Sequence, residues 1–206
     1  MSMTLLETTR GRIYLALLAV AGLFLSVAPI LAWLSYDLQI SQGGVTSEVW
    51  VYVTGFGSMS ASSAVPGVSF AFPTLAGWWY GNTVLVVGIL TLLTSLIAFR
   101  SAESAGLIGF ILGFVNMMPF TFFVGRGPEI SSIVYSFVQA IQGAGYTLLA
   151  GSSTYAVGFI LDLVGTALLP ISSILIVSNA TKLRIGKRQE EQKKRKEEEE
   201  MGSLPA

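Results

Sequence analysis

The sequence contains no cysteine and no histidine among its 206 residues. This double absence excludes a disulfide framework, a thiolate zinc site, a cysteine-bound iron–sulfur cluster and a histidine general base. Charge is scarce as well, because only 12% of the residues are charged while 52% are hydrophobic. Since so few charges cannot cover a soluble globule, the composition predicts an integral membrane protein.

Four apolar runs are long enough to cross a bilayer, which takes about 20 helical residues. They lie at residues 13–34, 81–99, 104–124 and 155–178. The first run has no small-residue cleavage pattern and is interpreted as a retained helix. We therefore expect an all-α membrane protein, in which a four-transmembrane-helix bundle over residues 1–180 precedes a charged cytoplasmic tail over residues 181–206.

The basic residues predict the orientation in the cell membrane. Lys and Arg gather before the first run, between the second and third, and after the fourth, whereas the segment 35–80 has none and the segment 125–154 has only Arg126. The positive-inside rule then places both termini in the cytoplasm and these two segments outside. Aromatic residues near the outer ends of the runs, including Trp33, Trp78 and Trp79, are expected to be interfacial anchors.

The first outer loop is rich in β-branched and aromatic residues. Residues 36–40 and 45–53 flank the turn sequence Gln42-Gly43-Gly44 and predict an extracellular β-hairpin, and residues 68–72 are a candidate third strand. The second outer loop has apolar residues at helical spacing from Ile130 to Ile141 after Pro128-Glu129. It predicts an amphipathic helix that lies on the membrane or covers the spans.

Asp162 is the only charged side chain well inside any apolar run. Helical counting places it at a depth shared by one polar residue from each of the other three runs, namely Asn116, Thr91 and Ser26. These four residues are predicted to form an intramembrane polar layer. In one interpretation a protonated Asp162 holds the helices together, and in another it binds a cation or relays a proton, with the other three as neutral ligands. A third interpretation pairs Asp162 with a basic residue of a partner subunit.

Small residues at intervals of four predict close helix packing. The third run has Ala105, Gly109 and Gly113, and the first run has Gly22 followed by Ser26. Packing within the monomer is the simpler explanation, and a seam between subunits is the alternative. Pro29, Pro119 and Pro170 are expected to bend three of the four helices.

The plan resembles that of the claudin-like tetraspan proteins. The shared features are four spans, internal termini, a tight inner turn and a large strand-forming first outer loop. The resemblance covers architecture from about residue 13 to residue 178. The family's loop signature is not reproduced, because Ser47, Glu48 and Val49 precede Trp50 and the paired cysteines are missing.

These features favour a noncatalytic membrane subunit or scaffold, without cofactor or metal, that assembles with other membrane or surface proteins in the lipid bilayer. The expected interaction surface lies in the first outer loop and consists of Trp50, Tyr52, Phe70, Phe72, Trp78 and Trp79. The alternative is a small ion or proton pathway centred on Asp162. The nearly charge-balanced tail argues against a nucleic-acid partner.

Overall fold

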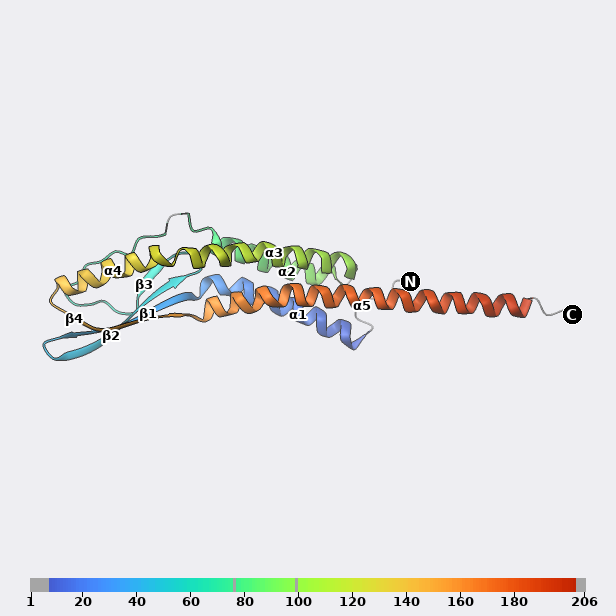
Figure 1. Cartoon of the computed structure of the whole chain (residues 1–206), viewed down its shortest axis with the longest axis horizontal. Helices are drawn as coiled ribbons and strands as arrows, with labels where there is room; N and C mark the ends of the chain where they lie inside the picture. The colour runs from blue at the N-terminus through green and yellow to red at the C-terminus, as the bar shows by residue number, and fades with distance from the viewer. Residues whose placement is uncertain (1–7, 76, 99, 203–206) are drawn as a thin grey trace.

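The chain folds into an elongated molecule with three parts (Figure 1). The computed structural model describes residues 8–75, 77–98 and 100–202, and the side chains up to residue 197. A helical bundle occupies the middle, a small sheet with one helix forms a head at one end, and a single helix projects as a tail from the other end.

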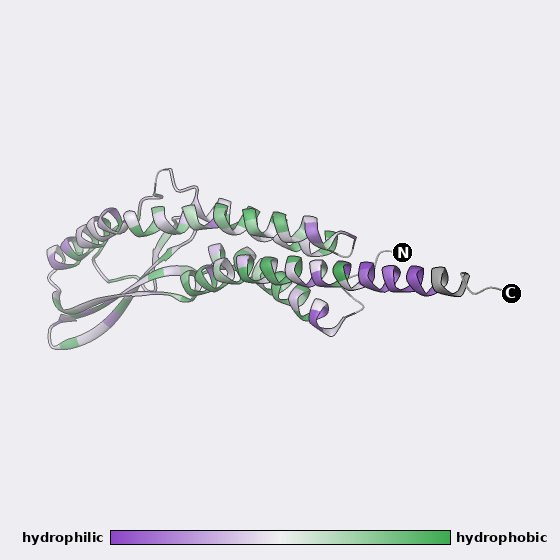
Figure 2. Cartoon of the chain, turned by 45° about the vertical axis from the view of Figure 1, so that its right-hand side comes forward, coloured by the Kyte–Doolittle hydropathy of each residue, from purple (hydrophilic) through white to green (hydrophobic). Residues whose placement is uncertain are grey.

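Four helices are long and apolar enough to cross a membrane, which makes the chain a multi-pass membrane protein by length and composition. They are α1 (Thr9–Val27, extended by the 3₁₀ turn η2 at Ala28–Ile30), α2 (Tyr80–Ile97), α3 (Ala102–Gly125) and α5 (Val157–Gly202). Figure 2 shows that the hydrophobic residues concentrate on these helices and that the tail of α5 is hydrophilic. The sequence thus predicted four helical spans correctly, although the predicted end of the second, residue 99, lies outside the described residues.

The first span ends earlier than predicted. The apolar run continues to residue 34, but α1 stops at Val27 and strand β1 begins at Ala32. Pro29 sits in the intervening η2 turn, where its missing N–H and fixed φ end the α-helix instead of bending it. Trp33 consequently belongs to the strand, and it is fully buried. The expectation that Trp33 anchors the chain at a lipid interface is therefore wrong.

The head is built on a four-stranded antiparallel sheet with the order β3-β2-β1-β4. Its strands are β1 (Ala32–Gln42), β2 (Val45–Thr54), β3 (Met59–Ala61) and β4 (Thr147–Tyr155). The predicted hairpin is present, and Gly43 and Gly44 have the positive φ angles that its turn requires. The candidate strand at residues 68–72 is not a strand, and the sheet is completed by β4 from the second predicted loop. The small sheet predicted beside the helices is therefore present. It is not confined to the first outer loop, however, because β4 comes from the second.

Helix α4 (Gly127–Gly143) is the predicted amphipathic helix, and its apolar side covers the sheet, while Ile130 at its start joins the buried cluster of the bundle. Its apolar residues, including Val134, Phe137 and Ile141, share a buried cluster with Leu38 and Val51 of the sheet. Phe70 and Phe72 also pack on Phe137, at centroid distances of 5.2 and 4.9 Å. The alternating apolar residues of segment 68–72 thus pack on α4. Burial against this helix explains why the segment has a strand-like sequence pattern without being a strand.

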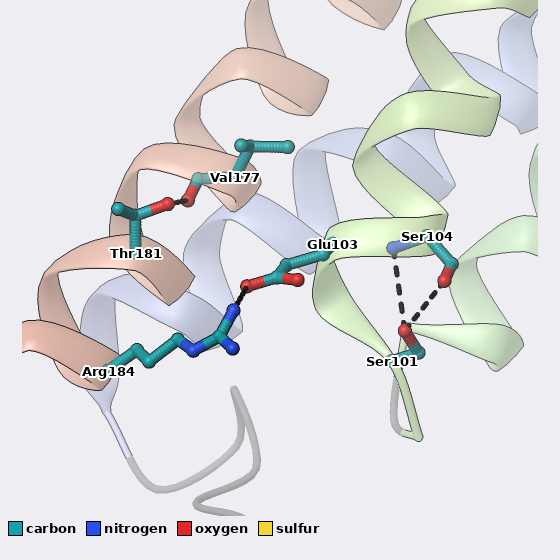
Figure 3. A network of polar contacts seen from close by, with 6 residues as sticks. All are labelled: Ser101, Glu103, Ser104, Val177, Thr181 and Arg184. Carbon is teal, nitrogen blue, oxygen red and sulfur yellow. Dashed lines mark hydrogen bonds and ion pairs between the residues drawn. The ribbon is translucent and has the colours of Figure 1, made fainter. Parts of the chain in front are cut away.

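The fourth span is one continuous helix that includes the charged tail. We predicted a span from residue 155, but Tyr155 ends β4, and α5 then runs from Val157 to Gly202. Pairs four residues apart, such as Glu190 with Lys194, support the tail as expected for a solvated helix. At the start of the tail, Arg184 contacts Glu103 of α3 at 3.3 Å, and Ser101 caps α3 through the Ser104 N–H (Figure 3).

Candidate functional site

Asp162 lies fully buried in the bundle and forms a hydrogen-bonded cluster with Asn116 and Thr166. The Asn116 amide of α3 donates to Asp162 Oδ1 at 2.8 Å and to Thr166 Oγ1 at 2.6 Å. The Thr166 hydroxyl is 3.4 Å from Asp162 Oδ1 and can donate to it. We call these three residues the polar trio. They join α3 to α5, the pair of helices that holds the carboxyl group away from lipid.

Two oxygen atoms of the polar trio take part in none of these hydrogen bonds. Asp162 Oδ2 and Asn116 Oδ1 are both buried and have no hydrogen-bond partner within the described part of the chain. A buried polar atom without a partner costs about 1–3 kcal/mol, and more if it is charged. These two atoms and Ser173 Oγ are the buried side-chain oxygens without a hydrogen-bond partner in the described part of the bundle.

Two members of the predicted polar layer, Thr91 and Ser26, form their hydrogen bonds away from the polar trio. The Thr91 hydroxyl is buried and donates to Val87 O at 2.8 Å, and the Ser26 hydroxyl donates to Gly22 O at 2.8 Å, both within their own helices. No hydrogen bond links either hydroxyl to the polar trio among the residues described. Thr166 takes their place, and its position one turn after Asp162 on the same helix face is the sequence signal that would have identified it.

The small residues face neighbouring helices of the same chain. A Cβ atom added to Gly109 would collide with Ser173 Oγ of α5, and one added to Gly113 would lie 3.1 Å from Pro170 Cδ. The same addition to Gly22 would come 2.9 Å from the Leu92 side chain of α2. Ala105 is fully buried. The close contacts of these three glycines lie inside the bundle, as the simpler explanation expected.

An aromatic cluster separates the polar trio from the head. Trp33 packs edge-on against Phe123 at 4.9 Å and Phe159 at 6.3 Å, and its indole N–H donates to Ala28 O at 2.8 Å. Trp78 contacts Phe123 at 5.7 Å and donates to Gly55 O at 2.7 Å. A cavity of about 240 Å³ on the head side is lined by Phe123 and Tyr155 but by no member of the trio.

The six residues predicted as an interaction surface do not lie on one surface. Trp50 and Tyr52 are half-buried on one face of the sheet, whereas Phe70 and Phe72 lie with α4 on the other. Trp78 is buried in the aromatic cluster, so its expected role as an interfacial anchor is wrong. Trp79 is 42% exposed and contacts Phe122 at 5.6 Å. Trp50, Tyr52 and Trp79 therefore remain candidates for contact with another molecule.

The sheet has one covered and one open face. Tyr36, Leu38 and Val51 point toward α4, and the alternate residues point away from it. Figure 1 shows α4 on one side of the strands. Side chains of the opposite face belong to neither buried cluster among the described residues. We call this surface the open face, and its central members are Asp37, Gln39, Glu48, Trp50 and Tyr52.

Asp37 is the focus of the open face. It lies opposite Trp50 of β2 and Ser152 of β4, while Gln39 lies opposite Glu48. One carboxylate oxygen of Asp37, Oδ1, is buried and has no partner among the residues that the structure describes. Because carboxylates and aromatic rings both attract cations, the open face has the chemistry to accept a basic side chain.

The two ends of the molecule differ sharply in basic residues. Eleven of the twelve Lys and Arg lie near the start of α1, in the α2–α3 turn or from Lys182 onward, and Arg126 is the remaining one. Arg126 forms an ion pair with Glu129, whose hydrogen bond raises the pKa of the guanidinium above its ordinary value. Asn179 donates to Thr8 at 3.4 Å, so the start of α1 lies beside the start of the tail. The basic groups therefore collect at the tail end.

Comparisons with known proteins do not assign the chain to a family. No family model matches the chain, and no curated protein matches it significantly.

Proposed function

We propose that this protein is a noncatalytic subunit or scaffold of a cell-membrane assembly, and that it binds a partner protein through the open face of its head. The single observation that supports this role most is Asp37, a half-buried carboxylate on a sheet face that the described residues leave uncovered, with one oxygen, Oδ1, that has no partner among them. A carboxylate with an unused acceptor gains from a charged donor, and a docked protein would supply one.

The chemistry of the open face indicates a basic partner. It presents two carboxylates, Asp37 and Glu48, beside Trp50 and Tyr52, and the sequence between Arg12 and Arg100 contains no Lys or Arg. An Arg side chain can donate two hydrogen bonds to a carboxylate and stack on an aromatic ring. We infer a partner segment that carries Arg or Lys and lies across β1 and β2.

The edge of the same sheet offers a second point of contact. β4 pairs with β1 on one side only, and its nine residues include no charge and no proline. Natural edge strands are usually protected by those residues, so an unprotected edge is suited to pairing with a strand of another chain. The proposed partner would bind the open face and this edge together.

The distribution of basic residues supports an orientation with both termini in the cytoplasm and the head outside. The absence of cysteine makes a direct test simple. A single cysteine placed at exposed Ser63 in the head should react with a membrane-impermeant maleimide in intact cells, and one at exposed Gln192 in the tail should not. The reverse pattern would overturn the orientation.

The docking proposal is tested by purifying the full chain from its native membrane in mild detergent and measuring the mass of the complex. We expect a stoichiometric partner that is lost in the variant Glu48→Lys, because the new charge repels a basic segment. Gln139→Lys, which adds the same charge on the exposed side of α4, is the matched control and should keep the partner. A monodisperse monomer without other chains would refute the proposal, as would equal retention in both variants.

A proton or small-ion pathway centred on Asp162 is the second candidate, favoured by the two unpartnered oxygens of the polar trio. Reconstitution into liposomes followed by a flux assay tests it. In this model Asp162→Asn abolishes flux, whereas Thr91→Val preserves it because the Thr91 hydroxyl bonds only within its own helix. Flux that is unchanged in Asp162→Asn would remove the carboxyl group from any transport mechanism.

A further inference from the structure

We propose that the polar trio is a binding site for a single proton, which resides on Asp162 Oδ2 and makes this side chain a neutral carboxylic acid. The inference rests on the hydrogen-bond geometry of the trio and on the charges around it. It does not depend on either of the functions proposed above.

Every hydrogen-bond donor of the polar trio already has an acceptor within the trio. Both hydrogens of the Asn116 amide are used, one toward Asp162 and one toward Thr166, and the hydroxyl hydrogen of Thr166 is directed to Asp162 Oδ1. The atoms left without a partner among the described residues, Asp162 Oδ2 and Asn116 Oδ1, are both acceptors. One added proton turns the first of these acceptors into a donor and removes the negative charge of the buried carboxylate.

Among the described residues, the hydrogen-bond partners of Asp162 are Asn116 and Thr166, and neither is a cation that could balance a carboxylate. The elements packed against α5 here are α1, η2, β1 and α3. In the described parts of these elements and of α5 up to the tail, the ionisable groups are Arg10, Arg12 and Tyr14 of α1, Tyr36 and Asp37 of β1, Glu103 of α3, and Lys182 of α5. The α1 and Glu103 groups lie toward the tail end, where Glu103 meets Arg184. Neutralisation by a proton removes the cost of a bare charge in this interior.

A metal ion fits the trio poorly. Calcium requires about six to eight oxygen ligands and magnesium about six. The trio has four side-chain oxygens, and the Asn116 N–H groups already bind two of them. Asp162 is the only carboxylate of the trio, and no group of three or more acidic side chains that could hold a metal occurs in the described part of the chain. A proton needs only one free carboxylate oxygen, and Asp162 Oδ2 is such an atom.

The amino-acid composition allows a direct measurement. Asp37 and Asp162 are the only two aspartates of the chain, so labelling the aspartate γ-carboxyl carbon gives two resonances. The variant Asp37→Asn assigns them without touching the trio. We expect the Asp162 resonance of the full chain in lipid nanodiscs to have the chemical shift of a neutral carboxylic acid at neutral pH. A carboxylate shift at neutral pH would overturn the inference.

A second measurement uses side chains that mimic one protonation state. Asn has the shape of a neutral Asp and can donate from the position of Oδ2, so Asp162→Asn should unfold at the same temperature as the wild type at neutral pH. Asp162→Leu, with similar volume but no polar atoms, is the matched control and should melt at a lower temperature because it leaves the Asn116 amide without its acceptor. Equal losses in both variants would show that the negative charge itself was needed, and would contradict the proposal.

Discussion

The bundle and the head each hold one of the two aspartates, and each leaves one carboxylate oxygen of that residue unpartnered. Their surroundings differ. Asp162 is enclosed by helices with its neighbours supplied by the same chain, whereas Asp37 lies on the open face of a sheet that is covered on one side only. We propose that the same chemical deficit has two different solutions, namely a proton inside the bundle and a partner protein at the head.

The surroundings of the two unpartnered carboxylate oxygens differ in how far each aspartate is buried. In the bundle, Asp162 is fully buried and its hydrogen-bond partners come from the same chain. At the head, Asp37 is only half-buried and lies opposite the half-buried Trp50, although its unpartnered Oδ1 is itself covered. The burial of the whole side chain, and not the chemistry of the carboxylate, is the difference between the two sites.

The largest effect is expected at the junction between the two regions. Trp33→Ala removes a fully buried ring that contacts Phe123 and Phe159, and it should lower the free energy of unfolding by about 3–5 kcal/mol. Trp79→Ala, which truncates a ring that is 42% exposed, is the matched control and should cost clearly less. Reversible unfolding in mixed micelles measures both. Equal losses would mean that the aromatic cluster does not couple head and bundle.

The next effect concerns the close packing of the bundle. Gly109→Val places a branched side chain against Ser173 Oγ and Leu18, and overpacking of this kind should cost about 1–3 kcal/mol. Gly186→Val, at a position in the tail with open space around it, should cost less because it meets no neighbour. If Gly109→Val changed the oligomeric state while leaving the stability of the monomer intact, the seam would lie between chains.

The polar trio is expected to contribute less than the aromatic cluster. Asn116→Leu removes two hydrogen bonds between helices, and because double-mutant cycles in membranes average about 0.6 kcal/mol per bond, the variant should lose about 1 kcal/mol. Thr94→Val removes a hydroxyl that bonds only to Leu90 O of its own helix, and provides the control. An Asn116→Leu variant as stable as the control would remove the trio from the list of contacts that hold α3 to α5.

The smallest effect is expected at the tail end. Arg184→Gln breaks the ion pair with Glu103, in which both side chains are more than half exposed. Exposed pairs contribute about 0–1 kcal/mol and are screened by salt. The difference between Arg184→Gln and wild type should therefore vanish in concentrated salt. A large loss that persists in salt would indicate that the tail is fixed to the bundle by more than this pair.

The sequence predicted those elements whose signals are local. Apolar runs of span length, the Gln42-Gly43-Gly44 turn and the helical spacing after Pro128 each correspond to an element of the structure. The pairing of Asn116 with Asp162 was also foreseeable, because counting residues from the ends of two spans gives their depths. These features depend on chain geometry within one element or on a shared membrane axis.

The parts that sequence could not supply depend on contacts between distant segments. β4 carries Gly151, Ser152 and Ser153, which are poor strand residues, and it becomes a strand because β1 offers a free edge beside it. The segment 68–72 has a better strand pattern, but α4 binds its apolar face. Trp33 resembled an interfacial residue because nothing in the sequence shows that Phe123 and Phe159 enclose it.

The length of α5 has a mechanical consequence. β4 passes into α5 through the single residue Ala156, and the helix then continues without a break to Gly202. The portion from Lys182 onward extends about 30 Å at 1.5 Å per residue, so it acts as a spacer that holds its far end at a fixed distance from the bundle. Pro170 removes one backbone hydrogen bond from this rod. It marks the point where a displacement of the head would be absorbed as a bend before it reached the tail.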